Sequence, residues 1–303
     1  MELAATSGVE DSLLVTLVLP AALALIMFVL GTSLTVEDFK RVLVLPRGVA
    51  IGMTNLLVVS PLLAFAIAEL YGLDPILAVG LVLLGASPGG TMANILTHFA
   101  RGDTALSVTM TALSSVVSVI TVPVYLGLAT SFFEAGELGD VEMAGVVARV
   151  FAITIIPISL GMWFRSRRTE WVRDRQRTLR AIAFGVFVAV VVAAVASEWE
   201  TVADNLAEVG AAALTLNVAA MTISFTAAKL ARLTDRQATA IAMELGVHNS
   251  TLAITVGATL ATGVSTPAAV YSAFVFLTAG VLARGIDKRK DPVPDEDGRL
   301  AVD

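Results

Sequence analysis

One carboxylate lies deep inside an apolar stretch of this chain. Glu244 is the only formal charge from Gln237 to Gly263, and His248 follows it four residues later. Burying an ionised side chain in hydrocarbon costs about 3 kcal/mol or more, so such a residue marks an ion or substrate path. Residues 246–250, Gly-Val-His-Asn-Ser, have a low propensity to continue a helix. We therefore expect an ion site at a point where a helix breaks.

A second group of polar side chains lies in the first half of the chain. Asn94, Ser107 and Thr111 carry oxygen atoms within apolar runs, and Ser107 and Thr111 share a helix face because they are four residues apart. Such oxygens, one carboxylate and the free carbonyls of a broken helix suit Na⁺. For each Ser or Thr taken alone, helix packing or bonding to the preceding turn is the alternative interpretation.

Glu244 and His248 allow other interpretations. A histidine and a carboxylate inside a membrane are suited to relaying protons, and a structural histidine is the simpler alternative. In a membrane-embedded enzyme the pair would act as acid and base, but the sequence supplies no convincing nucleophile or metal cluster. A non-transporting receptor or scaffold is the remaining class.

The composition indicates an all-α polytopic membrane protein. The 303 residues are 56% hydrophobic and 15% charged, with mean hydropathy +0.84, whereas an average soluble domain is about 25% charged. Residues 1–10 lack the basic n-region of a cleavable signal peptide. The absence of cysteine excludes disulfides and cysteine catalysis. The lipid bilayer is an expected partner, whereas no nucleic acid or protein partner is implied.

Nine segments have about the 20 apolar residues that a membrane span needs. They lie near residues 12–33, 46–68, 75–99, 104–130, 143–164, 179–197, 207–229, 237–262 and 265–284. Every cluster of Lys and Arg follows an odd-numbered span, which places those ends in the cytoplasm. We expect one transmembrane domain over residues 1–285 in the plasma (inner) membrane, an outside N-terminus, and a cytoplasmic tail at 286–303.

Two of these spans are interrupted near their centres. Ser-Pro-Gly-Gly at residues 87–90 interrupts the third span, and residues 246–250 interrupt the eighth. Proline removes a backbone donor and glycine tolerates non-helical angles, so both are plausible breaks. The spans are five apart and run in opposite directions, as in inverted-repeat transporters. An ordinary kink is the alternative for either break alone.

The half-helices after the breaks predict where a substrate binds. They begin near Thr91 and Asn249, and a helix N-terminus favours an anionic group. A small organic anion, such as a carboxylate or sulfonate, is therefore expected near the midplane. Ser250 and Asn55 are the further candidates for contacting it.

The residues around both breaks resemble the bile acid:sodium symporter family. The matching stretches are residues 85–94 (GASPGGTMAN), 100–107 (ARGDTALS) and 244–253 (ELGVHNSTLA). The resemblance implies two crossing broken helices and elevator- or rocking-type alternating access. It also implies a core domain near 75–130 and 207–284, and a panel domain near 12–68 and, in part, 143–197. In having nine spans, the chain is similar to the family members that lack the first helix of the ten-helix, two-repeat arrangement.

The same resemblance implies the sodium ligands. Asn94, Ser107, Thr111 and Glu244 would hold one Na⁺. A second Na⁺ would be held by Glu244, by the backbone at Leu245 and Val247, and by a side chain at position 248. The family has Gln at that position, whereas this chain has His248. A further family Gln near Leu56 is also absent, so the chain departs from the family pattern at the second site. The leading hypothesis is a sodium-coupled symporter of an organic anion, and proton coupling through Glu244 and His248 is the alternative.

Overall fold

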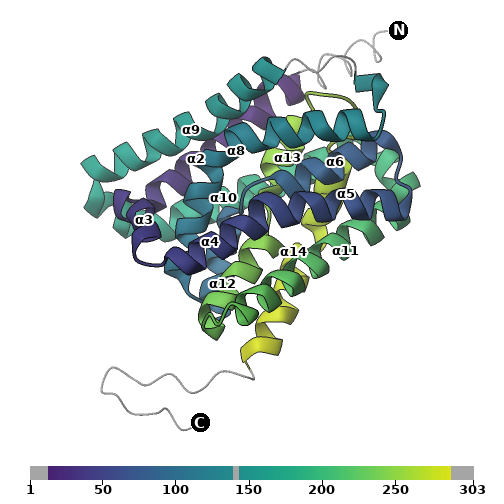
Figure 1. The fold of residues 1–303 in the computed structure, drawn as a ribbon. Helices are drawn as coiled ribbons and strands as arrows, with labels where there is room; N and C mark the ends of the chain where they lie inside the picture. Colours follow the sequence, from purple (N-terminus) through teal and green to yellow (C-terminus); the bar gives the residue numbers. More distant parts are fainter. Residues whose placement is uncertain (1–12, 139–142, 288–303) are drawn as a thin grey trace.

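In the computed structural model of the protein, residues 13–138 and 143–287 are described, and their regular elements are all helices (Figure 1). Seven helices in this part of the chain are long and apolar enough to cross a membrane. They are α2 (Leu19–Ser33, after the π turn η1, Leu14–Val18), the α4–η3–α5 rod (Pro46–Thr54, Asn55–Val59 and Ser60–Tyr71), α8 (Thr104–Phe132), α9 (Met143–Arg167), α10 (Thr169–Ser197), α11 (Trp199–Leu230) and α14 (Thr266–Asp287). The all-helical, multi-pass expectation is confirmed.

The third and eighth predicted spans are each a pair of shorter helices. The first pair is α6 (Pro75–Ala86) and α7 (Thr91–Phe99), and the second is α12 (Asp235–Gly246) and α13 (Ser250–Gly257). The first break falls at residues 87–90, as predicted. The second is shorter than predicted, because Gly246 and Ser250 belong to the helices and residues 247–249 alone are unwound.

Local sequence signals start these helices. The Asp74 carboxylate accepts a hydrogen bond from the Ile76 amide at 3.0 Å, and Pro75 follows it at the first helical position of α6. Thr234 and Gln237 form a capping box at the start of α12. Each device satisfies backbone donors that a helix N-terminus leaves free.

Three helices form one packed group. Helices α2, α9 and α10 contact one another, and α2 and α9 approach so closely that a Cβ atom on Gly31 would lie 2.9 Å from the Ile158 Cα. Small residues permit such close backbone contact between membrane helices. The short helix α3 (Val36–Lys40) follows α2 along the chain.

The α4–η3–α5 rod packs elsewhere. It contacts α6, α8, α11 and α12, the helices that surround the two breaks. Residues 46–71 therefore pack against a different set of helices from α2, and the expected division into a panel and a core domain stays a prediction. Hydropathy identifies a membrane helix but not the neighbours against which it packs.

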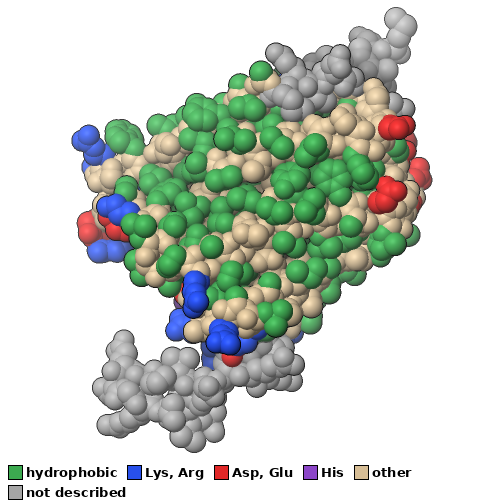
Figure 2. All heavy atoms as spheres, viewed as in Figure 1, with side chains coloured by type: hydrophobic (Ala, Val, Ile, Leu, Met, Phe, Trp, Pro, Cys, Tyr) green, Lys and Arg blue, Asp and Glu red, His purple; other side chains and the backbone are tan. Residues whose placement is uncertain are grey.

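Charge divides the two ends of the molecule. Figure 2 shows apolar side chains over the flank, Lys and Arg gathered at one end together with some Asp and Glu, and acidic side chains without visible Lys or Arg at the opposite end. On α8, the exposed residues Val116, Ile120, Val124 and Leu128 recur every four positions and form one apolar face, as a lipid-facing helix requires. From residue 288 onward, the predicted cytoplasmic tail lies outside the described residues.

Candidate ion and substrate site

The two broken helices meet at their unwound segments. Gly89 and His248 form an isolated antiparallel bridge. The Gly90 amide donates to the Val247 carbonyl at 2.7 Å, and the Asn249 amide donates to the Pro88 carbonyl at 2.8 Å. The breaks therefore satisfy each other's backbone groups, which removes much of the cost of interrupting a helix inside a membrane.

Glycine at position 89 lets the crossing reach Glu244. A Cβ atom at Gly89 would lie 2.6 Å from the Glu244 Cδ and 2.8 Å from its Cγ, closer than real Cβ contacts. No side chain other than hydrogen fits there without moving the carboxylate. Helix α12 thus holds the carboxyl group directly against the first break.

The predicted first sodium ligands converge around this carboxylate. Glu244 is fully buried, and the Ser107 Oγ lies 2.8 Å both from its Oε2 and from the Asn94 Oδ1. The Thr111 hydroxyl donates to the Glu244 Oε1 and lies 3.3 Å from the Asn94 Oδ1. Three elements, α7, α8 and α12, therefore place four oxygen-bearing side chains together.

This cluster has more acceptors than donors. Within the described part of the chain, the hydrogen bonds to the Asn94 Oδ1 and the two Glu244 oxygens come from the hydroxyls of Ser107 and Thr111 alone. A hydroxyl has one proton, so two protons serve three acceptor oxygens. Hard cations bind oxygen ligands of this kind, and a cation supplies the positive charge that such a cluster lacks.

His248 belongs to a separate hydrogen-bond network. Its Nε2 lies 2.8 Å from the Ser60 Oγ, at the start of α5, and its Nδ1 lies 3.3 Å from the Tyr271 hydroxyl. The Tyr271 hydroxyl donates to the Gly246 carbonyl at 2.6 Å and accepts from the Asn217 amide at 2.8 Å. Asn217 also donates to the Gly246 carbonyl at 2.7 Å.

The directions of these bonds fix the histidine tautomer. Because the single Tyr271 proton goes to the Gly246 carbonyl, the Nδ1 of His248 must donate to the Tyr271 oxygen. In the neutral imidazole the Nε2 then accepts from the Ser60 hydroxyl. The hydrogen-bond partners of the two ring nitrogens in the described structure are thus Ser60 and Tyr271, and not Glu244.

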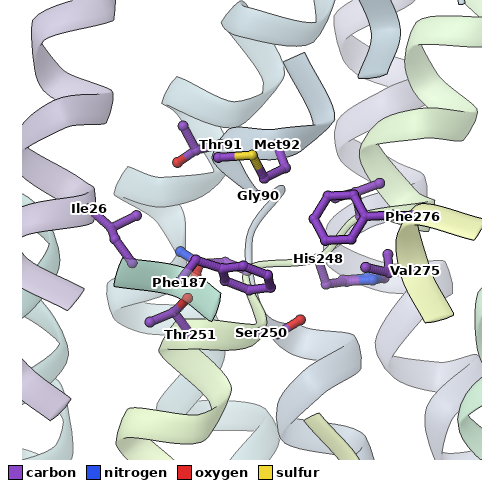
Figure 3. Close-up of a pocket in the computed structure, with 12 residues that line it drawn as sticks. Ile26, Gly90, Thr91, Met92, Phe187, His248, Ser250, Thr251, Val275 and Phe276 are labelled. Carbon is purple, nitrogen blue, oxygen red and sulfur yellow. The ribbon is translucent and has the colours of Figure 1, made fainter. Parts of the chain in front are cut away.

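A small cavity lies beside the crossing, at the starts of α7 and α13 (Figure 3). Its volume is about 30 Å³, enough for a water molecule or two. Polar groups of Thr91, Asn249 and Ser250 line one part, and side chains from α2, α10 and α14 close the remainder. The apolar lining residues are Ile26, Met92, Phe187, Val247, Val275 and Phe276.

Two lining residues differ in their hydrogen bonding. The Asn249 Oδ1 accepts from the Leu252 amide at 3.1 Å and so caps α13. The Thr91 Oγ1 is buried without a hydrogen-bond partner in the described structure. An unpaired buried hydroxyl costs free energy, and an acceptor entering the cavity would relieve that cost.

The structure does not bring the predicted substrate residue Asn55 to the cavity. The Asn55 amide donates to the Ile51 carbonyl at 2.8 Å within its own helix, and its side chain does not line the cavity. The backbone of Leu245 and Val247 was expected at a second sodium. The Leu245 side chain is buried among apolar side chains, and the Val247 carbonyl accepts from the Gly90 amide.

Sequence reasoning missed Asn217 and Tyr271. Both are fully buried and hold the carbonyl that ends α12. Asn217 could have been found by the signal that identified Glu244, a strongly polar side chain in the middle of an apolar span. Tyr271 gives no such signal, because a tyrosine is ordinary in a membrane helix.

Comparison with known proteins agrees with this architecture. The model of the sodium bile acid symporter family matches residues 20–205. The chain is 30% identical to the "Uncharacterized sodium-dependent transporter YocS" of Bacillus subtilis over 266 residues, which cover 86% of this chain and 80% of the relative. It is 26% identical to the ileal sodium/bile acid cotransporter of Homo sapiens over 252 residues, covering 81% and 70%. A third relative is the Arabidopsis thaliana protein named "Probable sodium/metabolite cotransporter BASS1, chloroplastic", 29% identical over 91% of this chain and 68% of the relative. The crossing helix breaks and the family match together establish that the chain belongs to the sodium bile acid symporter family.

Proposed function

We propose that this protein is a symporter that couples Na⁺ to the uptake of a small organic anion by alternating access. The observation that carries the proposal is the acceptor-rich cluster around Glu244, which lies directly beside the starts of two half-helices. The cluster supplies a cation site from Asn94, Ser107, Thr111 and Glu244, and the half-helices supply an anion site a short distance away. Two ions of opposite charge at one crossing stabilise each other, which is the physical basis of coupling.

The substrate class follows from the cavity lining. No Lys or Arg is among the described residues that line the cavity, so the N-termini of α7 and α13 are the sources of positive potential that would attract the anion. The unpaired Thr91 hydroxyl is a donor ready for a carboxylate or sulfonate oxygen. Ile26, Phe187 and Phe276 would contact an apolar body. At about 30 Å³ the cavity must widen to admit such a molecule, as alternating access requires.

We assign one sodium to each transport cycle. The Val247 carbonyl accepts from the Gly90 amide, and His248 is held by Ser60 and Tyr271. Two of the groups expected to hold a second Na⁺ thus already have protein partners. The same contacts argue against proton relay between Glu244 and His248, because both ring nitrogens are hydrogen-bonded to other side chains.

The proposed architecture has nine spans and an inverted repeat. The pairs α6–α7 and α12–α13 are the corresponding broken helices, α2, α9 and α10 form the panel domain, and the remaining helices form the core domain. We place the basic end of the molecule in the cytoplasm, with an outside N-terminus and a cytoplasmic C-terminus in the plasma (inner) membrane. Movement of the core against the panel would expose the crossing to each side in turn.

Uptake into proteoliposomes tests this function. With a panel of labelled carboxylates and sulfonates, we expect an inward sodium gradient to drive accumulation, with a non-sigmoidal dependence on sodium concentration. Potassium in place of sodium is the control. Accumulation driven by a pH gradient in the absence of sodium would overturn the proposal and favour proton coupling.

Replacing Thr91 with Val tests the anion site. The substitution keeps the shape but removes a hydroxyl that has no partner in the substrate-free structure. A hydrogen bond to a charged group contributes about 1.5–3 kcal/mol, so we expect the KM for the anion to rise about tenfold or more while sodium binding is unchanged. KM is measured by uptake at saturating sodium.

Thr255→Val is the matched control. Thr255 also has a buried hydroxyl without a partner, but it does not line the cavity. We expect the Thr255→Val variant to have the same KM for the anion as the wild type. Equal effects of the two substitutions would show that Thr91 does not contact the substrate.

A further inference from the structure

Two adjoining cavities that share Arg180 lie beside the basic end of α10, and we treat them as the two parts of one candidate site. The polar part has a volume of about 300 Å³, lies among the ends of α2, α9 and α10, and is lined by Arg165, Arg173 and Arg180 among other residues. The apolar part has a volume of about 330 Å³ and lies between α7, α10 and α14. Arg180 lines both parts, and every other residue around the second part is apolar.

The polar part contains positive charge that the protein does not neutralise. In the described structure no carboxylate lies within salt-bridge distance of Arg165 or Arg180, whereas Arg173 pairs with Glu170 and approaches Asp174 at 4.0 Å. The Arg165 Nη1 donates to the carbonyls of Thr32 and Ser33, which end α2. Two guanidinium groups facing one cavity repel each other unless an anion lies between them.

The apolar part is open to the surroundings of the helices. Phe99 on α7 is 74% exposed and Phe184 on α10 is 42% exposed, and both line it. Phe184 follows Arg180 by one helical turn, so its ring lines the apolar part about 6 Å further along the helix axis than the arginine. A ligand that fits both parts has an anionic head and a hydrocarbon chain.

We propose that this two-part cavity binds an anionic phospholipid, with its phosphate at Arg165 and Arg180 and an acyl chain in the groove beside Phe184. Arginine forms paired hydrogen bonds with phosphate, and basic pockets between membrane helices on the cytoplasmic side bind lipid headgroups. The leaflet assignment rests on the orientation proposed above. Because Met92 and Phe276 line both the groove and the midplane cavity, the acyl chain would lie directly against the transport site.

Native mass spectrometry of the purified full-length protein tests the proposal. The probes are phosphatidylglycerol and phosphatidylcholine with identical acyl chains. We expect selective retention of phosphatidylglycerol, and Arg180→Gln to weaken it about fivefold, the effect of one basic residue beside an anionic membrane. Arg177→Gln is the control, since Arg177 is exposed on the same helix and lines neither part.

A second variant tests the groove without altering charge. Ala181→Trp fills the apolar part, and we expect this variant to retain less phosphatidylglycerol. In a separate competition experiment on the wild type, glycerol phosphate, which has the head but no acyl chains, is expected not to displace the lipid. Equal retention of phosphatidylcholine, an equal loss in Arg177→Gln, or no effect of Ala181→Trp would each overturn the lipid site. Sodium-induced thermal stabilisation of the same samples is expected to be unchanged, which separates this result from a failure of the proposed transport function.

Discussion

Replacing Glu244 with Gln is expected to abolish sodium-dependent uptake and to lower sodium affinity at least about 100-fold, because losing one partner of a buried ion pair costs about 3–5 kcal/mol. Glutamine has nearly the same shape, so the loss reports charge and not packing. Its amide group also brings donors into a cluster where Ser107 and Thr111 already donate to the carboxylate. Sodium-induced thermal shift and uptake in proteoliposomes measure the two effects.

Glu69→Gln makes the same chemical change where no sodium site is proposed. Glu69 is exposed at the end of α5, and its substitution is expected to leave both measurements at wild-type values. Retention of sodium-dependent binding in Glu244→Gln would remove the carboxylate from the cation site. Glu244→Asp keeps the charge but shortens the side chain by one methylene. We therefore expect its sodium affinity and its uptake to lie between those of the wild type and those of the Gln variant.

The parts of this site that sequence could predict are those with a local physical cause. Proline and glycine marked the first break, the cost of a charge in hydrocarbon marked Glu244, and a four-residue spacing placed Ser107 and Thr111 on one face. Each inference uses residues within one or two helices. The convergence of Asn94 with Glu244 across 150 positions was expected from the two matched breaks, and the family resemblance then implied the same ligands.

The parts that sequence could not predict depend on packing between distant helices. Ser60 lies 188 residues from His248 in the chain, and hydropathy does not indicate which helices become neighbours. The same limitation applies to residues 46–68, because hydropathy does not indicate which domain a span joins. Asn55 lies in a π turn, where its amide bonds to its own helix, and the residues there give no clear sign of that turn.

Replacing Gly89 with Ala is expected to reduce sodium-dependent uptake by about 10- to 100-fold. The added methyl group would collide with the Glu244 carboxylate, and forcing an extra carbon into a packed site costs about 1–3 kcal/mol. The carboxylate must move, and the sodium ligands separate. Gly185→Ala is the control, because a Cβ atom at that position of α10 meets nothing within 4 Å.

A double-mutant cycle separates this collision from a general disturbance of the break. Shortening the acidic side chain in Glu244→Asp withdraws the carboxylate from the new methyl group, so Gly89→Ala is expected to cost less in the Asp background than in the wild type. Gly90→Ala serves as the contrast, since its Cβ atom would meet the Val247 carbonyl oxygen at 2.8 Å and not the carboxylate. Its cost is expected to be the same in both backgrounds. If the effects of Gly89→Ala and Glu244→Asp on uptake are additive, the glycine serves the backbone crossing alone. If Gly89→Ala costs less in the Asp background than in the wild type, the first break shapes the cation site directly.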